Sequence, residues 1–323
     1  MNQTLFIINP VSARGTTLRT WAAARRQLIE LGFEFTEHTT SRAGEAVEIA
    51  RDAISSGAGS VVAVGGDGTL NEVVNGYFDE SGRAVNPSAA IGLLPSGTGS
   101  DFRRSIEIND WREAVRALVE SKTRLIDAAR ITFTDANGKI AVRSFINMAS
   151  FGLGGDVSAL VNLWRYSLPR WIGGQARFAA AAISALKRFK NKSVTVEMDG
   201  KRTVEIISNL IVVANGRFAG GGMMLAPNAK LDDGLLDVIL TDRATRLDVL
   251  KELPRISRGG YLKNPKVMEL RAREVSIRSD EPMAIDIDGE MIGHTPARLT
   301  VLPAAVRFVM NEELEAGAGI NVA

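Results

Sequence analysis

The sequence predicts an α/β + β chain, in which an N-terminal doubly wound α/β domain precedes a mainly antiparallel β-sandwich. Over residues 1–128, apolar strand-like runs alternate with amphipathic helical stretches, which is the pattern of a parallel sheet with helices on both faces. From residue 129 the strand-like runs follow one another directly, and Asn137-Gly138 and Asp199-Gly200 are strong hairpin signals. A length of 323 residues is enough for two hydrophobic cores. We therefore divide the chain into domains at 1–128 and 129–303, with a C-terminal strand and tail at 304–323 that can return to the first domain.

The composition excludes several classes of protein. Hydrophobic residues make up 45% of the chain, yet no apolar run of about 18 residues could span a bilayer. The absence of cysteine excludes disulfides, thiolate zinc sites and thiol catalysis. A formal net charge of +2 is too small to indicate a nucleic-acid partner. The N-terminal stretch lacks the basic segment and cleavage site of a signal peptide, so we expect a cytoplasmic protein.

The first domain is expected to contain four strands, at 4–9, 33–39, 61–64 and 89–94. The 3.6-residue period predicts helices at 16–31, at 44–56, from Thr69 onward and at 109–121. The apolar stripes are Leu18, Trp21, Ala22, Leu28 and Leu31 in the first of these helices and Trp111, Ala114, Val115 and Leu118 in the last. Ligands of such sheets bind at the carboxyl ends of the strands, which is where both glycine-rich turns of this domain lie.

The turn Gly65 to Gly68 is the most informative stretch of the sequence. It follows a valine-rich strand, and the spacing of Thr69 and Glu72 predicts a capping box at the start of the next helix. Glycines let the backbone approach a phosphate, and the N–H groups and dipole of a helix N-terminus favour the anion. Asp67 would repel a phosphate, so its carboxylate indicates either a bridging Mg²⁺ or a structural hydrogen bond within the turn.

In the second domain the strand-like segments are 193–198, 204–214, 236–241, 267–270, 275–278, 283–287 and 298–302. Helices interrupt them at 174–188 and 245–257. The polar, glycine-bearing tail at 312–323 is expected to fray.

A series of short motifs spans nearly the whole chain. In order they are Asn9-Pro10 with Ser12 and Gly15, Thr40 before Gly44 and Ala46, Gly65 to Glu72, Leu94-Pro95-x-Gly97-Thr98, Asp127, Asn147 with Gly152, Asn215-Gly216, Gly220 to Pro227, Lys230 to Asp237, and Asp288-Gly289-Glu290. Together they resemble the diacylglycerol kinase catalytic-domain family, which contains soluble bacterial lipid kinases and the sphingosine and ceramide kinases. The more distant NAD kinases and phosphofructokinases share the Gly-Gly-Asp-Gly turn. One departure is Gly99-Ser100, where the family usually has Ala-Asn, and it puts fine positioning in doubt more than the reaction.

The resemblance implies an ATP site whose phosphates are held by backbone N–H groups of the two glycine turns. The implied nucleotide-binding residues are Asn9, Thr40, Gly65, Gly66, Asp67, Gly68, Thr69, Leu70, Asn71, Glu72, Gly97 and Thr98. It also implies an acidic cluster that orders Mg²⁺ and its waters, formed by Asp67, Asp101 and Asp127.

Two further sites follow from the resemblance. The Asp288-Gly289-Glu290 turn is where the family carries its general base, and the residues leave open whether Asp288 or Glu290 takes the proton. Lys230, Asp233 and Leu235 resemble a loop that binds a structural Mg²⁺ through one carboxylate and two backbone carbonyls, oxygen ligands that suit this cation.

The activity expected from these motifs is ATP-dependent phosphorylation of a lipid hydroxyl, with diacylglycerol, phosphatidylglycerol or a sphingoid base as acceptor. One alternative is phosphorylation of a nucleotide in the manner of the NAD kinases. The Asn9-Pro10 motif near the N-terminus and the Asp288-Gly289-Glu290 motif near the C-terminus resemble the lipid kinases more than the NAD kinases. The other is a catalytically silent lipid-binding module, against which the retained acidic residues argue.

A lipid substrate predicts transient peripheral contact with a membrane, and we also allow for a homodimer. Aromatic and basic residues alternate over 164–178, and a basic stretch follows at 187–192, which is the composition of an interfacial segment. Aromatic residues at helical spacing also form hydrophobic cores, so the segment can instead be a helix that packs inside the protein.

Overall fold

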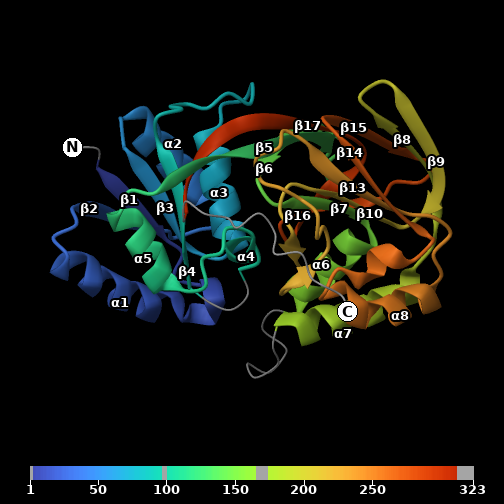
Figure 1. Ribbon diagram of the computed structural model, residues 1–323, viewed down its shortest axis with the longest axis horizontal. Helices are drawn as coiled ribbons and strands as arrows, with labels where there is room; N and C mark the ends of the chain where they lie inside the picture. Colours follow the sequence, from blue (N-terminus) through green and yellow to red (C-terminus); the bar gives the residue numbers. More distant parts are fainter. Residues whose placement is uncertain (1–2, 97–99, 165–173, 311–323) are drawn as a thin grey trace, which may run out of the picture.

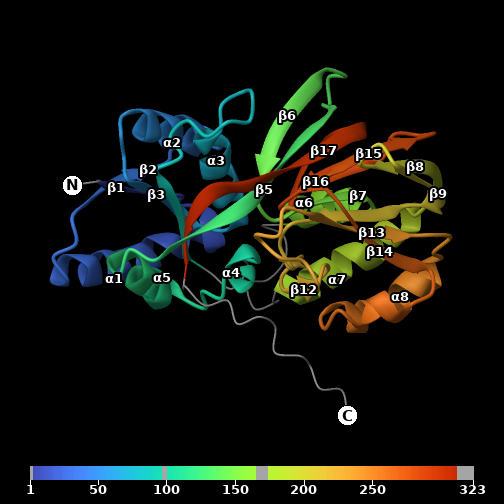
Figure 2. The ribbon, with the colours of Figure 1, turned by 45° about the horizontal axis from the view of Figure 1, so that its top comes forward.

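The computed structural model describes residues 3–96, 100–164 and 174–310 (Figure 1). In its first part, β1 (Thr4–Ile8), β2 (Phe35–Thr39), β3 (Ser60–Gly65) and β4 (Ala90–Pro95) form a parallel sheet in the order β2-β1-β3-β4. Helices α2 (Glu45–Ser55) and α3 (Asp67–Tyr77) pack together on one face, and α1 (Thr17–Glu30) and α5 (Trp111–Val119) on the other (Figures 1 and 2). The short helices η1 (Ser12–Gly15) and α4 (Phe102–Ser105) complete this part. The predicted doubly wound α/β domain is confirmed.

The second part is a sandwich of antiparallel strands, as predicted. One layer contains β7 (Met148–Gly152), β10 (Leu210–Ala214), β13 (Leu236–Thr241), β14 (Val267–Ala272) and β16 (Ala284–Ile287). The other contains β5 (Thr123–Thr134), β6 (Ile140–Phe145), β8 (Lys192–Met198), β9 (Arg202–Ser208), β15 (Glu274–Ser279) and β17 (Glu290–Val309). Buried side chains of both layers form one apolar cluster between them.

Helices cover the outer face of the first of these layers. They are α6 (Leu153–Leu163), α7 (Gly174–Ala185) and α8 (Arg246–Ile256), with the short η2 (Leu186–Arg188) and η3 (Gly260–Lys263) (Figure 1). Two apolar clusters lie beneath them. A small hairpin of β11 (Phe218–Ala219) and β12 (Met223–Met224) lies between β10 and β13 in the chain.

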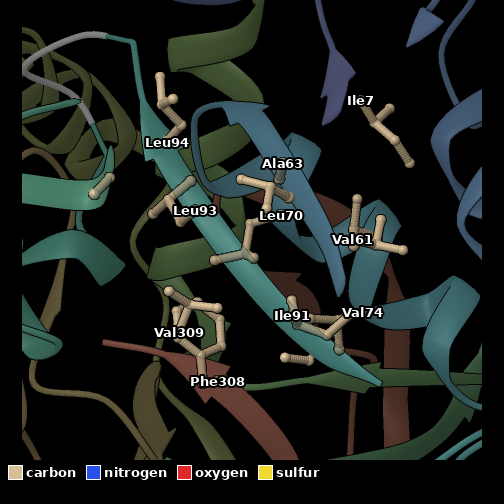
Figure 3. Packing of buried hydrophobic residues seen from close by; sticks show 14 of the residues in the cluster. Ile7, Val61, Ala63, Leu70, Val74, Ile91, Leu93, Leu94, Phe308 and Val309 are labelled. Atoms are coloured by element: carbon tan, nitrogen blue, oxygen red, sulfur yellow. The ribbon is translucent and has the colours of Figure 1, made fainter. Parts of the chain in front are cut away.

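Strands β5 and β17 form a ribbon that runs through both parts of the molecule (Figures 1 and 2). One half of this ribbon contributes to the sandwich core, whereas Val306 and Phe308 are buried in the core of the α/β part and β17 pairs with β4 there. Figure 3 shows Phe308 and Val309 beside Ile91 and Leu93 of β4. The pairing of β5 with β17 shifts register between Leu302 and Val306, at the passage from one core to the other.

Several local predictions are wrong. In α1 the buried residues are Thr17, Trp21, Ala24 and Leu28, while Leu18, Ala22 and Leu31 are exposed, because the stripe that meets the sheet begins one position earlier than predicted. The single strand predicted at 204–214 is divided at Asn209 into β9 and β10, which belong to different layers. The strand predicted at 298–302 is only the middle of the 20-residue β17.

Some predictions fall on residues outside the described ranges. These are Gly97, Thr98 and Gly99 of the second glycine turn, residues 165–173 of the predicted interfacial segment, and the tail from residue 311. Of the aromatic residues that flank that segment, Trp164 and Phe178 are partly buried against the cluster under α6 and α7. Within the described ranges, every helix is too short or too polar to cross a membrane.

Candidate functional site

The glycine turn lies between β3 and α3, beside the carboxyl ends of β1 and β4. Gly65 must be glycine because a Cβ there would lie 2.5 Å from Thr69 Oγ1. Gly66 and Gly68 have no such constraint, since an added Cβ would meet nothing within 4 Å and neither residue has a positive φ. Their missing side chains therefore leave an open backbone surface, which is what a phosphate needs to approach the N–H groups.

The predicted capping box at the start of α3 is wrong. The helix begins at Asp67, and no side chain of the described residues caps it. Thr69 Oγ1 instead accepts a hydrogen bond from Asn9 Nδ2 at 3.0 Å, and Glu72 Oε2 accepts one from the N–H of Ala46 at 3.1 Å. Because both side chains bind neighbouring elements, neither caps the N-terminal turn of α3, where free N–H groups favour an anion.

The remaining residues predicted to bind nucleotide are placed around this turn. Asn9 directly follows β1, and its own N–H donates to Val64 O at 3.1 Å. Thr40 follows β2, is buried, and donates through both its N–H and its Oγ1 to Ile8 O. Its hydroxyl is therefore already used within the sheet, which gives Thr40 a structural contact rather than a free donor.

Asp67 makes structural hydrogen bonds to the segment that follows the second glycine turn. Its Oδ1 accepts from Ser100 Oγ at 2.9 Å and from the N–H of Phe102 at 3.1 Å, and its Oδ2 accepts from the N–H of Asp101 at 2.7 Å. Burial raises the pKa of Asp67, and these donors oppose that effect. Ser100, which stands where an asparagine is usual, thus supplies a donor to Asp67.

Asp101 lies next to Asp67 and faces the loop of the second domain that joins β11 to β12. Its Oδ2 accepts from the N–H of Gly221 at 2.7 Å, in a run of three glycines whose φ angles are 67°, 82° and 100°. Its Oδ1 is buried without a hydrogen bond to any described residue and lies 4.0 Å from Arg104 Nε. Burial, together with the charge of Asp67, raises the pKa of Asp101 to about 7.

The Asp288-Gly289 turn brings a third carboxylate to the same place from the second domain. Asp288 and Gly289 have φ angles of 51° and 88° and form the two-residue turn of the β16–β17 hairpin. Asp288 Oδ2 accepts from Asn71 Nδ2 of α3 at 2.9 Å, and Oδ1 accepts from the N–H of Met148 at 3.2 Å. Burial is the main cause that raises the pKa of Asp288 to about 8, and the charges of Asp67 and Asp286 add to it.

Glu290 differs from Asp288 in its surroundings. It is exposed at the start of β17, beyond the turn. The structure therefore brings Asp67, Asp101 and Asp288 together and leaves Glu290 at the surface.

Asp286 is a carboxylate that the sequence prediction missed. It is 7% exposed, accepts from Ser150 Oγ at 3.3 Å, and its Oδ2 has no hydrogen-bond partner among the described residues. Burial raises the pKa of Asp286 to about 7. No signal in the sequence marks it, because a charged residue between Ile285 and Ile287 in an alternating strand is expected to face solvent, whereas Asp286 is buried.

Asp127, the third member of the predicted acidic cluster, has different hydrogen-bond partners from Asp67 and Asp101. It is buried on β5, where its Oδ1 accepts from the N–H of Ala304 at 2.7 Å and its Oδ2 from the N–H of Gly234 at 2.6 Å. One carboxylate oxygen thus binds the loop 230–235, and the other binds β17 where its pairing with β5 shifts register. This arrangement gives Asp127 a role in joining the ribbon to that loop.

In the loop 230–235, the carboxylate of Asp233 accepts from the N–H of Leu235 at 3.1 Å and lies 3.6 Å from Arg271 Nη1. Lys230 is exposed. Close by, Asp237 is fully buried, pairs with Arg271 Nε at 3.2 Å, and has an Oδ2 without a hydrogen bond to any described residue.

Comparisons with known proteins cover both parts of the chain. Residues 3–131 match the model of the diacylglycerol kinase catalytic domain, and residues 147–310 match that of the YegS C-terminal NAD kinase beta sandwich-like domain. A diacylglycerol kinase of Staphylococcus carnosus is 31% identical over 90% of this chain and 89% of its own length. A diacylglycerol kinase of Bacillus subtilis is 28% identical over 97% and 98% of the two chains. A crystal structure from Bacillus anthracis str. Sterne, assigned to the diacylglycerol kinases, shares the fold with a TM-score of 0.76 at 22% identity, covering 96% of each chain.

The fold and these matches define a two-domain kinase, with an α/β domain that carries the glycine turn and a sandwich that closes over it. The chain belongs to the diacylglycerol kinase catalytic-domain family and is a lipid kinase. Membership of a kinase family implies the use of a nucleotide as phosphoryl donor.

Proposed function

We propose that this kinase transfers the γ-phosphoryl group of ATP, with Mg²⁺, to a hydroxyl of a lipid such as diacylglycerol, and that Asp288 is the general base. The observation that carries the proposal is the carboxylate of Asp288, which one domain presents to Asn71 of the other, on the helix that begins at the glycine turn. An alcohol is a poor nucleophile at neutral pH, and a carboxylate with a raised pKa is suited to take its proton.

In the proposed reaction the proton of the lipid hydroxyl passes to Asp288. The oxygen of that hydroxyl forms a bond to the γ-phosphorus. The bond between that phosphorus and the oxygen of the β-phosphate breaks, and ADP leaves. The N–H groups around Gly66 and Gly68 hold the phosphates, because the backbone there is open and uncapped. Asn71 and the N–H of Met148 orient the base.

The residues near the turn fit a magnesium ion. Asp101 Oδ1 is buried with no hydrogen bond to a described residue, although Arg104 Nε lies 4.0 Å from it, and Asp67 lies beside Asp101, so carboxylate oxygens of the required kind are present. When bound, Mg²⁺ would neutralise charge on the phosphates. In the loop 230–235, the ligands proposed for a second, structural ion are the carboxylate of Asp233 and the backbone carbonyls of Lys230 and Leu235, and Arg271, 3.6 Å from Asp233, is the cation that competes for that carboxylate.

An apolar cavity supports a lipid as acceptor. It has a volume of about 60 Å³ and lies between α8 and strands β10 and β13, with Val212, Leu225, Ile239, Val249, Ile256 and Tyr261 among its lining residues. Asp248, Glu252 and Lys266 also line it, but most of its surface is apolar, and such a surface accepts apolar groups. Met148, whose N–H binds Asp288, belongs to the same buried cluster as Val212 and Ile239. The cluster thus connects the candidate base to a site for part of an acyl chain.

The proposal is tested by incubating the purified chain with labelled ATP, Mg²⁺ and, separately, diacylglycerol, phosphatidylglycerol, a sphingoid base and NAD. Label transferred to a lipid is the expected result. Transfer to NAD alone would replace the proposal with nucleotide phosphorylation. Lipid binding without any transfer would identify a catalytically silent module.

The pH dependence of turnover follows from the raised pKa of Asp288. Only the ionised carboxylate can accept a proton, and with a pKa of about 8 this form is the minor one at pH 7. We expect kcat/KM to rise about tenfold per pH unit below pH 8 and to level off above it. The rise should be absent from the residual activity of Asp288→Asn, and a profile that is flat from pH 6 to 9 in the parent would contradict the role.

Replacement of Asp233 tests the proposed structural ion. An ion that binds only the folded state stabilises it by mass action, so Mg²⁺ should raise the melting temperature of the parent more than that of Asp233→Ala, which keeps only the site proposed near Asp67 and Asp101. The variant should also melt at a lower temperature than the parent when Mg²⁺ is present. Asp232→Ala is the matched control, because Asp232 precedes Asp233 and pairs with Arg124 instead. Equal responses to Mg²⁺ in all three proteins would contradict the site.

A further inference from the structure

Asn75 lies one turn after Asn71 on α3 and contacts both domains. Its Nδ2 donates to Asn71 O at 2.8 Å, to Asn71 Oδ1 at 3.0 Å and to Ser144 O of β6 at 2.9 Å. Its Oδ1 accepts from the N–H of Ser144 at 3.0 Å. Asn75 is partly buried, and Ser144 is 5% exposed. One amide therefore joins the helix of the glycine turn to a strand of the sandwich.

The contact with Asn75 fixes the acceptor end of the Asn71 amide, and the acceptors Asp288 Oδ2 and Ser144 O face its donor end. Asn71 Oδ1 accepts from Asn75, so the NH₂ group of Asn71 is directed at Asp288 Oδ2, 2.9 Å away, and at Ser144 O, 3.4 Å away. An amide has a donor end and an acceptor end of nearly equal size. If Asn75 were lost, rotation of the Asn71 amide would place its oxygen against the carboxylate of Asp288, where two acceptors repel one another.

We propose that Asn75 is a positioning residue that keeps the Asn71 donor directed at Asp288. It also fixes the position of the glycine turn relative to the Asp288 turn. The proposal rests on the role of Asp288 given above. It assigns to Asn75 no contact with substrate or nucleotide. Its effect passes through Asn71, whose donor stabilises the ionised form of Asp288, while the charged groups that face Asp288 are Asp67 and Asp286.

Asn75→Ala is expected to lower kcat about tenfold and to leave the KM for ATP within about twofold, because the phosphate-binding backbone is untouched. The pH at which kcat/KM levels off should move upward, since the carboxylate loses a donor to its charged form. In a background of Asp288→Asn, the same change should have little further effect, because the two residues act as one unit. The three measurements together separate positioning from a general loss of stability.

Two further variants keep the test decisive. Asn75→Asp keeps an oxygen that can accept from the N–H of Ser144, whereas the donor to Ser144 O and to Asn71 Oδ1 is replaced by an acceptor. This variant decides the matter if the alanine variant does not fold. Asn191→Ala is the matched control, since Asn191 is also partly buried and donates to a backbone carbonyl, that of Ala244, at 2.8 Å. It should keep the turnover and pH profile of the parent.

The inference is overturned if folded Asn75→Ala or Asn75→Asp keeps the kcat and pH profile of the parent. It is also overturned if Asn75→Ala lowers kcat by the same factor with and without Asp288. Failure of the proposed function is recognised separately, by full turnover in Asp288→Asn alone.

Discussion

Asp288→Asn should lower turnover by about 100-fold or more while the KM for ATP changes little. The amide cannot accept the proton of the lipid hydroxyl, whereas the phosphates are held by the other domain, around Gly66 and Gly68. Asparagine also tolerates the left-handed backbone of this position, where φ is 51°, so the turn itself should persist. Steady-state kinetics with saturating lipid, together with a melting curve, measure the effect.

Two further variants are needed to interpret this result. Asp199→Asn is the matched control, because Asp199 and Gly200 form another turn with positive φ angles, 54° and 62°, in the same domain. Its carboxylate binds the N–H groups of Arg273 and Glu274, and its replacement should leave turnover unchanged. Glu290→Gln is the competing variant. A 100-fold loss there, with turnover intact in Asp288→Asn, would make Glu290 the base and refute the assignment to Asp288.

Asp67→Ala should abolish measurable phosphoryl transfer in a protein that still folds. The carboxylate binds Ser100 and the N–H groups of Asp101 and Phe102, so its loss releases the segment that carries Asp101. It also removes one of the two oxygen donors proposed for Mg²⁺. We expect a loss well beyond tenfold, which corresponds to more than about 1.4 kcal/mol in the barrier.

The control for Asp67 is Asp110→Ala. Asp110 is the N-cap of α5 and accepts from the N–H groups of Arg112 and Glu113, so its loss removes a helix cap without touching the glycine turn. It should cost about 1 kcal/mol of stability and leave turnover near that of the parent. Activity of Asp67→Ala within tenfold of the parent would refute the proposed role of this carboxylate in the reaction.

The arrangement of strands and helices could be predicted because it follows from local patterns. The alternation of strand and helix in the first domain, and the Asn137-Gly138 and Asp199-Gly200 turns in the second, are properties of neighbouring residues. The division of 204–214 at Asn209 could not be predicted, because both halves have the same strand-like composition and only their partners differ. The burial of Thr17 and the exposure of Leu18 on α1 likewise depend on which side of the helix meets the sheet.

The candidate site shows the same limit. Asp67, Asp101 and Asp288 could be predicted from sequence motifs, and the structure brings them together. The spacing of Thr69 and Glu72 suited a capping box, but contacts with Asn9 and Ala46, which are distant in sequence, take both side chains. Asp127 belongs to the same series of motifs, yet its partners Gly234 and Ala304 could be known only from the fold. Asp286 belongs to no motif, and only burial reveals it.

The course of β17 affects how the chain acquires its structure during synthesis. Domains at the N-terminus usually fold while the rest of the chain is still being made. Here Val306 and Phe308 fill the core of the α/β part, and β17 lies beside β4 at the edge of its parallel sheet. The first domain to leave the ribosome is therefore incomplete until nearly the last residues of the described chain have emerged. Such long-range pairing lowers the rate of folding.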